Sequence, residues 1–409
     1  MKKLIKLILI SFLVIAVGFG LFIATLKTNL LFRSADSFEL PVDCKAALVY
    51  STGRDVAERT QLIYCNKNGD TIANQQFASA SDKFAIEGCD KNYNFYTNEK
   101  VFFSNGHSID NEEMKEVYNF ASDNGYDTVR YSGYIKEWGM YYKSIPHGMA
   151  YNINELGFFD ILSLYNDSEI YNIRTSNLPI IAVKQDSNDV AIYCFNDHTD
   201  FDLEKTDPNI VFFEKIVRDG SEFQRKTGQI DISKATYKAE LSIINAIWVG
   251  DDLYMMVNRE EDHLHYYMYH CVKDGEEIRF INSVLLDWKQ LGLRDEGYVI
   301  YDQSMLFLRD NVIEYWQASS EFCAPGLICY NIDSQSFFFV NNDHYDEDLI
   351  SKYRTIGDSL YYLEQDKMDP SSFNIYTIET NNTYDHVATL KPVAAHLDDK
   401  LLVDFYFFE

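Results

Sequence analysis

Short apolar and aromatic stretches alternate with polar turns along most of this chain. A turn containing Asp, Asn or Gly leads into a strand-like stretch, and a second stretch and another polar turn follow. The spacing of adjacent copies matches one four-stranded propeller blade, roughly 40–55 residues. The gap between Leu178 and Gly250 is too long for one unit and predicts a further copy around 211–228. The clearest copies occupy 250–257 and 357–363, and weaker ones occupy 98–103, 138–142, 178–183, 302–308 and 397–403.

The best complete unit lies near the C-terminus. Residues 353–390 contain four strand-like stretches separated by turns at 357–358, 369–370 and 381–382. The last segment, 393–409, supplies only about two strands, and the first part of the repeat region supplies a few more. In a closed ring the two ends can share a blade, which removes exposed sheet edges. We therefore expect residues 401–408 to pair with a strand from the first 90 residues.

This rhythm resembles that of bacterial β-propeller proteins that sit outside the cell on one N-terminal helix. The resemblance covers most of residues 40–409 and implies an all-β fold. We expect a β-propeller of about seven four-stranded blades, with six or eight as alternatives. A tandem β-sandwich is the second possible architecture. Short helical insertions are expected at 110–121, where Asp110 is a candidate N-cap, and at 154–165, where helix and buried strand cannot be distinguished.

The first residues predict a membrane anchor. Residues 7–26 form an uncharged run of twenty residues, long enough to cross the hydrocarbon core as one helix. Three lysines precede the run, and positive charge tends to remain in the cytoplasm. The alternative is a cleaved secretory signal, whose apolar region is usually shorter. The predicted organisation is a cytoplasmic tail (1–6), a transmembrane anchor (7–26), a juxtamembrane linker (27–40) and an extracytoplasmic propeller (41–409), with the protein at the cell membrane as a single-pass protein.

The amino-acid composition says more about possible binding partners than about catalytic chemistry. Aromatic residues make up 15% of the chain, which favours strands. The formal net charge of -27 disfavours nucleic acid and anionic lipid headgroups as partners. The expected contacts are the membrane through the N-terminal helix and a protein or cell-wall partner. An acidic surface also keeps an aromatic-rich β-protein soluble.

The seven cysteines do not form an evident disulfide framework. They are spread thinly and their number is odd, although one or two pairs could form in an oxidising compartment. Cys323 and Cys329 flank a Pro325-Gly326 turn signal. A two-residue hairpin loop there would place Cys323 opposite Ile328, so a bridge would require a bulge or a wider loop. No CxxC metal spacing occurs.

One histidine pair is a candidate metal site. His263 and His265 share a face if they lie in a strand, and Glu261 or Asp262 could complete a zinc site. The competing interpretation is that the two histidines are exposed beside an acidic turn. In that case Tyr266 and Met268 form the buried face of the strand. We favour the second interpretation, and we expect no cofactor.

Other motifs predict turns rather than catalysis. Residues 357–360 spell the GDSL tetrapeptide of an esterase family, but no DxxH element follows, so we interpret it as the turn of the repeat. Two acidic clusters lack the EF-hand pattern and are interpreted as solvated loops. These clusters consist of Asp197, Asp200 and Asp202, and of Asp343, Asp346, Glu347 and Asp348.

The sequence favours a membrane-tethered extracytoplasmic binding or scaffold module that recognises a protein or a cell-envelope component. Two alternatives stay open. One is a carbohydrate-active hydrolase or lyase that uses paired carboxylates, although 63 acidic residues do not nominate a pair. The other is a structural subunit of an envelope complex. No catalytic residue is nominated.

Overall fold

The computed structural model shows an all-β ring. It describes residues 41–51, 59–78, 86–89, 95–97, 100–102, 108–110, 131–145, 160–166, 168–175, 180–186, 189–195, 209–235, 241–259, 265–292, 306–317, 326–341, 344, 349–356, 359–379, 383–393 and 401–408. Within these ranges no helix is long and apolar enough to cross a membrane. The predicted anchor at 7–26 and the predicted helix at 110–121 lie outside the described residues, apart from Asp110 at the end of a strand.

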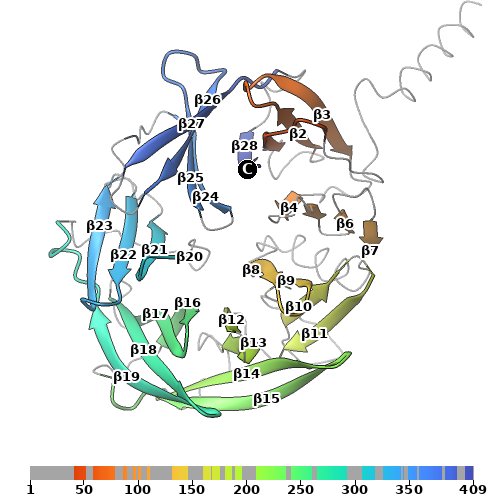
Figure 1. The fold of residues 1–409 in the computed structure, drawn as a ribbon. Coiled ribbons are helices and arrows are strands. Elements are labelled where there is room, and N and C mark those ends of the chain that lie inside the picture. The colour runs from red at the N-terminus through yellow and green to blue at the C-terminus, as the bar shows by residue number, and fades with distance from the viewer. Residues whose placement is uncertain are drawn as a thin grey trace, which may run out of the picture.

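The described strands form seven four-stranded antiparallel sheets arranged around a centre, which is the architecture of a β-propeller (Figure 1). Six of these sheets are regular blades. Listed from the inner to the outer strand, the first two blades are β28 (Leu401–Phe407), β1 (Ala46–Ser51), β2 (Arg59–Cys65) and β3 (Thr71–Ala78), and then β8 (Tyr131–Ile135), β9 (Met140–Ile145), β10 (Asp160–Tyr165) and β11 (Ile170–Thr175). The next two are β12 (Ile180–Asp186), β13 (Asp189–Phe195), β14 (Ile210–Asp219) and β15 (Glu222–Asp231), and then β16 (Leu241–Val249), β17 (Asp252–Arg259), β18 (Tyr266–Asp274) and β19 (Glu277–Leu285). The last two are β20 (Leu306–Arg309), β21 (Val312–Gln317), β22 (Gly326–Asn331) and β23 (Ser336–Asn341), and then β24 (Ser351–Ile356), β25 (Ser359–Gln365), β26 (Phe373–Ile378) and β27 (Tyr384–Leu390).

The remaining sheet is smaller. It consists of β4 (Ile86–Cys89), β5 (Phe95–Thr97), β6 (Lys100–Phe102) and β7 (Ser108–Asp110), and it lies between β3 and β8 in Figure 1. Its strands have only three or four residues. The prediction of about seven full blades is therefore corrected to six regular blades plus this small sheet, and the β-sandwich alternative is wrong.

The ring closes at its inner edge by pairing its two ends. The C-terminal strand β28 is antiparallel to β1, with Ala46 opposite Phe407. β28 is thus the inner strand of a blade whose other three strands come from the N-terminal part of the ring. This pairing confirms the prediction that 401–408 would close the ring. It removes two unpaired sheet edges, which would otherwise be able to bind other chains.

A second closure joins this blade to the blade formed by β24 to β27. Lys391 follows β27 and forms an isolated parallel bridge with Asp70. The Lys391 N–H donates to the Gly69 carbonyl at 2.8 Å, and the Val393 N–H donates to the Thr71 hydroxyl at 2.9 Å. A side chain at Gly69 would place its Cβ 1.8 Å from the Thr389 carbonyl oxygen. The approach of the two blades therefore requires glycine at this position.

The hydrophobic core lies between blades rather than inside any one of them. A middle strand of a blade can bury side chains on both faces, because each blade packs against two neighbours. In β18 the consecutive residues Tyr266, Tyr267, Met268 and Tyr269 are all buried. Such strands are continuous apolar runs without strict alternation. Outer strands such as β15 are mostly exposed, so hydrophobicity falls from the centre of the ring to its rim.

The two faces of the ring differ, because each blade begins at its inner strand and ends at its outer strand. We define the turn face by the connections 66–70, 136–139, 166–169, 187–188, 220–221, 250–251, 275–276, 310–311, 332–335, 357–358 and 379–383. We define the loop face by the connections 52–58, 79–85, 111–130, 146–159, 176–179, 196–209, 232–240, 260–265, 286–305, 318–325, 342–350, 366–372 and 391–400.

Several local predictions are confirmed or corrected. The predicted unit at 353–390 forms β24 to β27, as expected. The segment 211–228 is not a separate copy; it is the outer hairpin of the blade that begins at β12. Residues 160–165 of the ambiguous segment 154–165 form strand β10. Gly326 begins β22 and pairs with Gln317, so Pro325-Gly326 is not a two-residue hairpin loop.

Candidate functional site

The strand order places three of the motifs noted in the sequence on one side of the ring. The histidine pair falls in the connection 260–265, and the two acidic clusters fall in 196–209 and 342–350. All three connections belong to the loop face. The four longest connections in the chain, 111–130, 146–159, 196–209 and 286–305, also join strand ends on this face. The acidic clusters themselves lie outside the described residues.

The structure tests the histidine pair only in part. His265 directly precedes β18, whereas His263, Glu261 and Asp262 lie outside the described residues. Among the described residues, no group of three His, Cys, Asp or Glu side chains could hold a metal ion. Tyr266 is buried as expected, but Tyr267 on the histidine side is buried as well. The preference for two exposed histidines over a zinc site therefore stays a prediction, and metal analysis of the purified protein tests it.

The GDSL tetrapeptide occupies an inner hairpin. Residues 357–358 connect β24 to β25, and Ser359 is the first residue of β25. Residues 250–251 connect β16 to β17 in the equivalent position of another blade. The interpretation of this tetrapeptide as the turn of the repeat is therefore confirmed.

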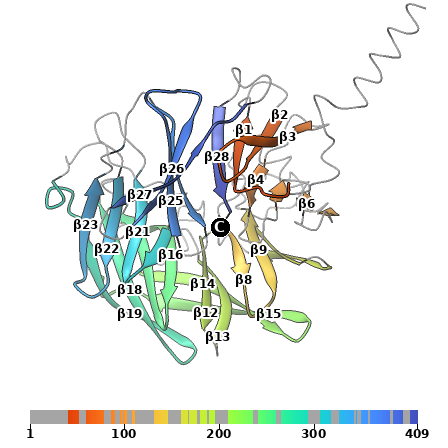
Figure 2. The same ribbon diagram turned by 45° about the horizontal axis from the view of Figure 1, so that its top comes forward.

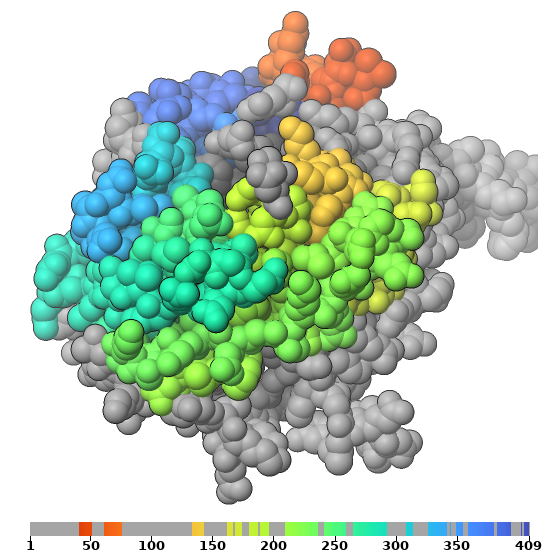
Figure 3. All heavy atoms as spheres, turned by 60° about the horizontal axis from the view of Figure 1, so that its bottom comes forward, coloured from red at the N-terminus to blue at the C-terminus, as the bar shows by residue number. Residues whose placement is uncertain are grey.

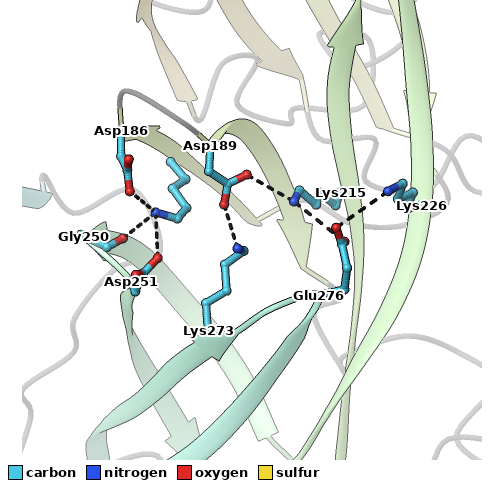
Figure 4. A network of polar contacts seen from close by, with 9 residues as sticks. Asp186, Asp189, Lys215, Lys226, Gly250, Asp251, Lys273 and Glu276 are labelled. Atoms are coloured by element: carbon cyan, nitrogen blue, oxygen red, sulfur yellow. Dashed lines mark hydrogen bonds and ion pairs between the residues drawn. The ribbon is translucent and has the colours of Figure 1, made fainter.

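A charged network between two blades was not predicted from the sequence. It lies near the turn face, between the blade that begins at β12 and the blade that begins at β16 (Figure 4). Lys184 on β12 is 1% exposed. Its Nζ donates to Asp186 at 2.6 Å and to the Gly250 carbonyl of the next blade at 2.8 Å. The same Nζ lies 3.2 Å from Asp251 Oδ1.

A reciprocal contact runs in the opposite direction. Lys273 on β18 reaches back to Asp189 on β13, with 2.9 Å between Nζ and Oδ2. The other oxygen of Asp189 lies 3.3 Å from Lys215 Nζ. Glu276 lies 4.0 Å from the same ammonium and 3.9 Å from Lys226 Nζ. Each blade therefore contributes lysines and carboxylates to the network, and the charges alternate across the interface, as Figure 4 shows.

Aromatic rings pack beneath these charges. The rings of Tyr193 and Trp248 lie 4.8 Å apart between centroids. Lys184 Nζ lies 5.7 Å above the Trp248 ring, and Lys215 Nζ lies 5.6 Å above the Tyr193 ring. Partly desolvated ammonium groups gain from such contacts. The Tyr193 hydroxyl and the Trp248 indole nitrogen are buried and have no hydrogen-bond partner among the described residues.

The electrostatics of the network favour fixed charges. Burial acts to raise the pKa of Asp189, but the hydrogen bond from Lys273 and the charge of Lys215 outweigh it and hold the pKa below its ordinary value. Burial acts to lower the pKa of Lys184, but its bonds to Asp186 and Asp251 outweigh it and raise the pKa. Both groups stay charged at neutral pH. A general acid or base needs a pKa near the working pH, so this network holds blades together and is poorly suited to proton transfer.

A neighbouring ion pair joins the strands β14 and β15. Arg225 Nη2 lies 2.6 Å from both carboxylate oxygens of Glu214, which is mostly buried. The hairpins β14–β15 and β18–β19 that carry these charges are the longest in the ring, and their outer strands contact each other. Figure 2 shows both hairpins at the rim, and Figure 3 shows their atoms in one continuous band, green and teal.

On the loop face, the connection 366–372 exposes an apolar side chain to solvent. Met368 is 92% exposed. Its N–H donates to Asp366 Oδ1 at 2.8 Å, and Asp366 Oδ2 accepts from Asn374 at 3.0 Å. The Ser371 hydroxyl donates to Asp369 at 2.6 Å. These bonds fix the loop before any partner binds, which lowers the entropic cost of binding.

The chain enters the ring on the turn face. Residues 41–45 lead into the start of β1, beside the end of β28, and the Phe408 N–H donates to the Lys45 carbonyl at 2.7 Å. Exposed carboxylates dominate the neighbouring turn-face connections of the two charged blades: Asp219, Glu222, Asp251, Asp274, Glu276 and Glu277. The loop face is therefore opposite both the point of entry and this acidic surface.

Comparison with known proteins supplies no activity. No family model matches the chain, and no curated protein is similar to it in sequence. The β-propeller domain of the Trilobed protease from Pyrococcus furiosus is 9% identical, with a TM-score of 0.43, over 88% of this chain and 97% of that chain. A neuraminidase-like protein from A/bat/Guatemala/164/2009 is 8% identical, with a TM-score of 0.31, over 60% and 83%. Trypanosoma rangeli sialidase is 8% identical, with a TM-score of 0.35, over 64% and 48%. The fold assignment rests on the strand order of this chain.

Proposed function

We propose that this protein is a membrane-tethered, extracytoplasmic binding or scaffold module that recognises a protein or cell-envelope component through its loop face. The observation that carries the proposal is the asymmetry of the ring. The longest connections join strand ends on the loop face, whereas the chain enters on the turn face. A tether on one face leaves the opposite face free to meet a partner. Loops on a rigid scaffold commonly carry binding function.

The proposed tether is the apolar run at 7–26. With the lysines before it in the cytoplasm, the ring lies on the far side of the membrane. The acidic surface around Asp251 and Glu276 then faces the bilayer, and anionic headgroups repel it. This repulsion holds the ring off the membrane surface, and the tether on the turn face leaves the loop face pointing away from the bilayer.

The proposed contact includes the loop at 366–372. An exposed methionine adapts to irregular apolar surfaces, and the bonds around Asp366 and Asp369 hold this one in place. Burial of such a side chain supplies affinity with little loss of loop entropy. Apolar contact at this loop suits a protein partner.

Affinity purification from the protein's own cell envelope tests the proposal. The full chain, solubilised with its anchor, should recover a specific envelope component. Met368→Asp should reduce this recovery at least several-fold. Ile281→Asp, at an apolar side chain that is 52% exposed on outer strand β19, is the matched control and should leave recovery unchanged. Equal recovery from all three proteins and from an unrelated bait would refute a specific binding role for the loop face.

A further inference from the structure

We propose that Cys44 and Cys65 form a disulfide bond that ties the point where the chain enters the ring to strand β2. Cys44 lies two residues before β1, and Cys65 is the last residue of β2. Both are buried, and both are present as free thiols in this structure. A bond between them would close a covalent loop around β1, the strand that pairs with the C-terminal strand.

The backbone holds the two residues side by side. Ala46 is opposite Cys65 in the β1–β2 register, and the Lys45 N–H donates to the Cys65 carbonyl at 2.8 Å. The Cys44 N–H donates to the Pro41 carbonyl at 3.1 Å, which folds the preceding segment into a turn. Cys44 and Ala46 are two residues apart, so in extended chain their side chains share a face with that of Cys65.

The sulfur of Cys44 points toward Cys65. Cys44 Sγ lies 3.3 Å from the Ala46 carbonyl oxygen. Burial raises the pKa of the Cys44 thiol, and a hydrogen bond from the backbone of Cys65 acts to lower it. A sulfur within hydrogen-bond reach of the partner's amide is near that partner's Cβ. Disulfides require Cβ atoms about 3.5–4.5 Å apart, so the proposal requires that a rotation of the Cys44 side chain and a shift of the turn at 41–44 bring the two residues to this spacing.

Three other buried cysteines have a different setting. Cys194, Cys271 and Cys329 are buried in β13, β18 and β22, which belong to three different blades. Disulfide geometry tolerates little separation between Cα atoms. These three serve as packing residues and supply matched controls for the pair near the start of the ring.

The chemistry sets when the bond forms. Burial raises the pKa of Cys44 to about 12 and that of Cys65 to about 11. The thiolate is the attacking species, so the folded, reduced protein oxidises slowly. During folding both thiols are still exposed. A small-molecule disulfide oxidant such as oxidised glutathione then accepts attack by one cysteine thiolate, releasing one glutathione thiol and forming a mixed disulfide. The second cysteine thiolate attacks the mixed disulfide and releases the second glutathione thiol, so that the two cysteines are oxidised and the oxidant is reduced.

The consequence is mechanical and thermodynamic. The bond shortens the free chain between residues 44 and 65 in the unfolded state, which stabilises the folded state. It also transmits any pull from the N-terminal side to β2 as well as to β1. Formation in the cell rests on the proposed extracytoplasmic location, because cytoplasmic thiols are kept reduced. Formation in the purified protein does not depend on that location.

Refolding under controlled redox conditions tests the proposal. The purified full chain in detergent is unfolded, reduced and refolded with oxidised glutathione, and peptides are mapped by mass spectrometry without reduction. We expect a peptide pair linked through Cys44 and Cys65, lighter than the separate peptides by the mass of two hydrogens. The oxidised protein should melt at a higher temperature than the same protein after reduction. Protein that is folded before oxidant is added should form the bond much more slowly, and faster at higher pH.

Variants distinguish the bond from ordinary packing effects. Cys44→Ala should abolish the linked peptide and the redox dependence of the melting temperature, whereas Cys271→Ala should lower the melting temperature equally in both redox states. Free thiols at both positions in correctly refolded protein would overturn the proposal, as would linkage of either residue to another cysteine. Export is measured separately, so a linked pair in a protein that stays in the cytoplasm would contradict the proposed function and leave this inference intact.

Discussion

Lys273 and Asp189 join two blades of the ring across 2.9 Å. Asp189 also lies 3.3 Å from Lys215 in its own blade, so one carboxylate compensates two mostly buried ammonium groups. Removing it would leave both lysines without this carboxylate in a poorly solvated interface. The stability of the interface therefore depends on this single residue more than on the exposed carboxylates around it.

We predict that Asp189→Asn lowers the free energy of unfolding at neutral pH by roughly 1–3 kcal/mol, the cost of leaving buried charged groups unpaired. The folded-state pKa of Asp189 is below the ordinary value of 3.8. Its contribution is thus complete above that value and is lost as pH falls through the folded pKa. Denaturant unfolding at several pH values should show the difference between wild type and variant shrinking below pH 3.8. Asp310→Asn, at an exposed turn, is the control and should change little; an equal effect from both variants would refute the role of the network.

Tyr193→Phe should leave the protein as stable as wild type or stabilise it by up to about 1 kcal/mol, because the buried hydroxyl has no hydrogen-bond partner among the described residues. Tyr376→Phe removes a hydroxyl that donates to Glu364 at 2.9 Å. This control should cost about 1 kcal/mol. Thermal unfolding of both variants checks the pair of predictions. A larger loss for Tyr193→Phe than for Tyr376→Phe would contradict them.

Gly69→Ala should destabilise the ring by about 2 kcal/mol or more, from a left-handed backbone at φ 81° and a clash with the Thr389 carbonyl. Gly220 has φ 63° and no neighbour within 4 Å of an added Cβ. Gly220→Ala should therefore show only the backbone cost of about 1 kcal/mol. The difference between the two variants in chemical denaturation measures the outer closure. Equal losses would mean that the contact with β27 adds nothing.

Deleting residues 393–409 should abolish the cooperative unfolding transition of the whole ring. The deletion removes β28 and exposes the edge of β1, which pairs with it from Ala46 to Ser51. Deleting residues 1–40, which precede the described ring, is the control and should leave the transition in place. Circular dichroism on heating provides the measurement. An unchanged melting curve for the C-terminal truncation would show that closure at β28 does not support the fold.

The sequence predicted the fold class because turn chemistry and strand length repeat along the chain. The blade from β24 to β27 was predicted strand by strand, since a polar turn separates each pair of its apolar runs. Closure by β28 followed from an incomplete blade at each end. The position at which each blade begins was harder to locate from the repeat. The copy at 250–257 corresponds to the second strand of its blade, whereas the copy at 178–183 contains the first strand of its blade. Copies out of phase made the region around 211–228 look like an additional unit.

The charged network could not be predicted, because it depends on how two blades meet. Lys184 contacts the carbonyl of Gly250, which lies 66 positions further along the chain, and Asp251 directly follows Gly250. No local spacing relates Lys184 to these two residues. The one local signal was a lysine directly after an apolar run: Lys184 follows residues 180–183 in β12 and is buried. A charge at such a position indicates a partner from another element, but it does not identify that partner. The preformed loop around Met368 likewise depends on hydrogen bonds that composition does not encode.

Site-specific photo-crosslinking in intact spheroplasts tests most directly whether this ring binds a partner outside the cytoplasm through its loop face. A photoreactive aromatic ketone residue would replace Met368 on the loop face, or Glu277 on the turn face, which is 75% exposed, in the full-length chain. We predict a discrete crosslinked species from position 368, removed by protease added outside the membrane, and none from position 277. Crosslinks from 277 alone, or none from either position in a protein that the added protease can reach, would contradict the account.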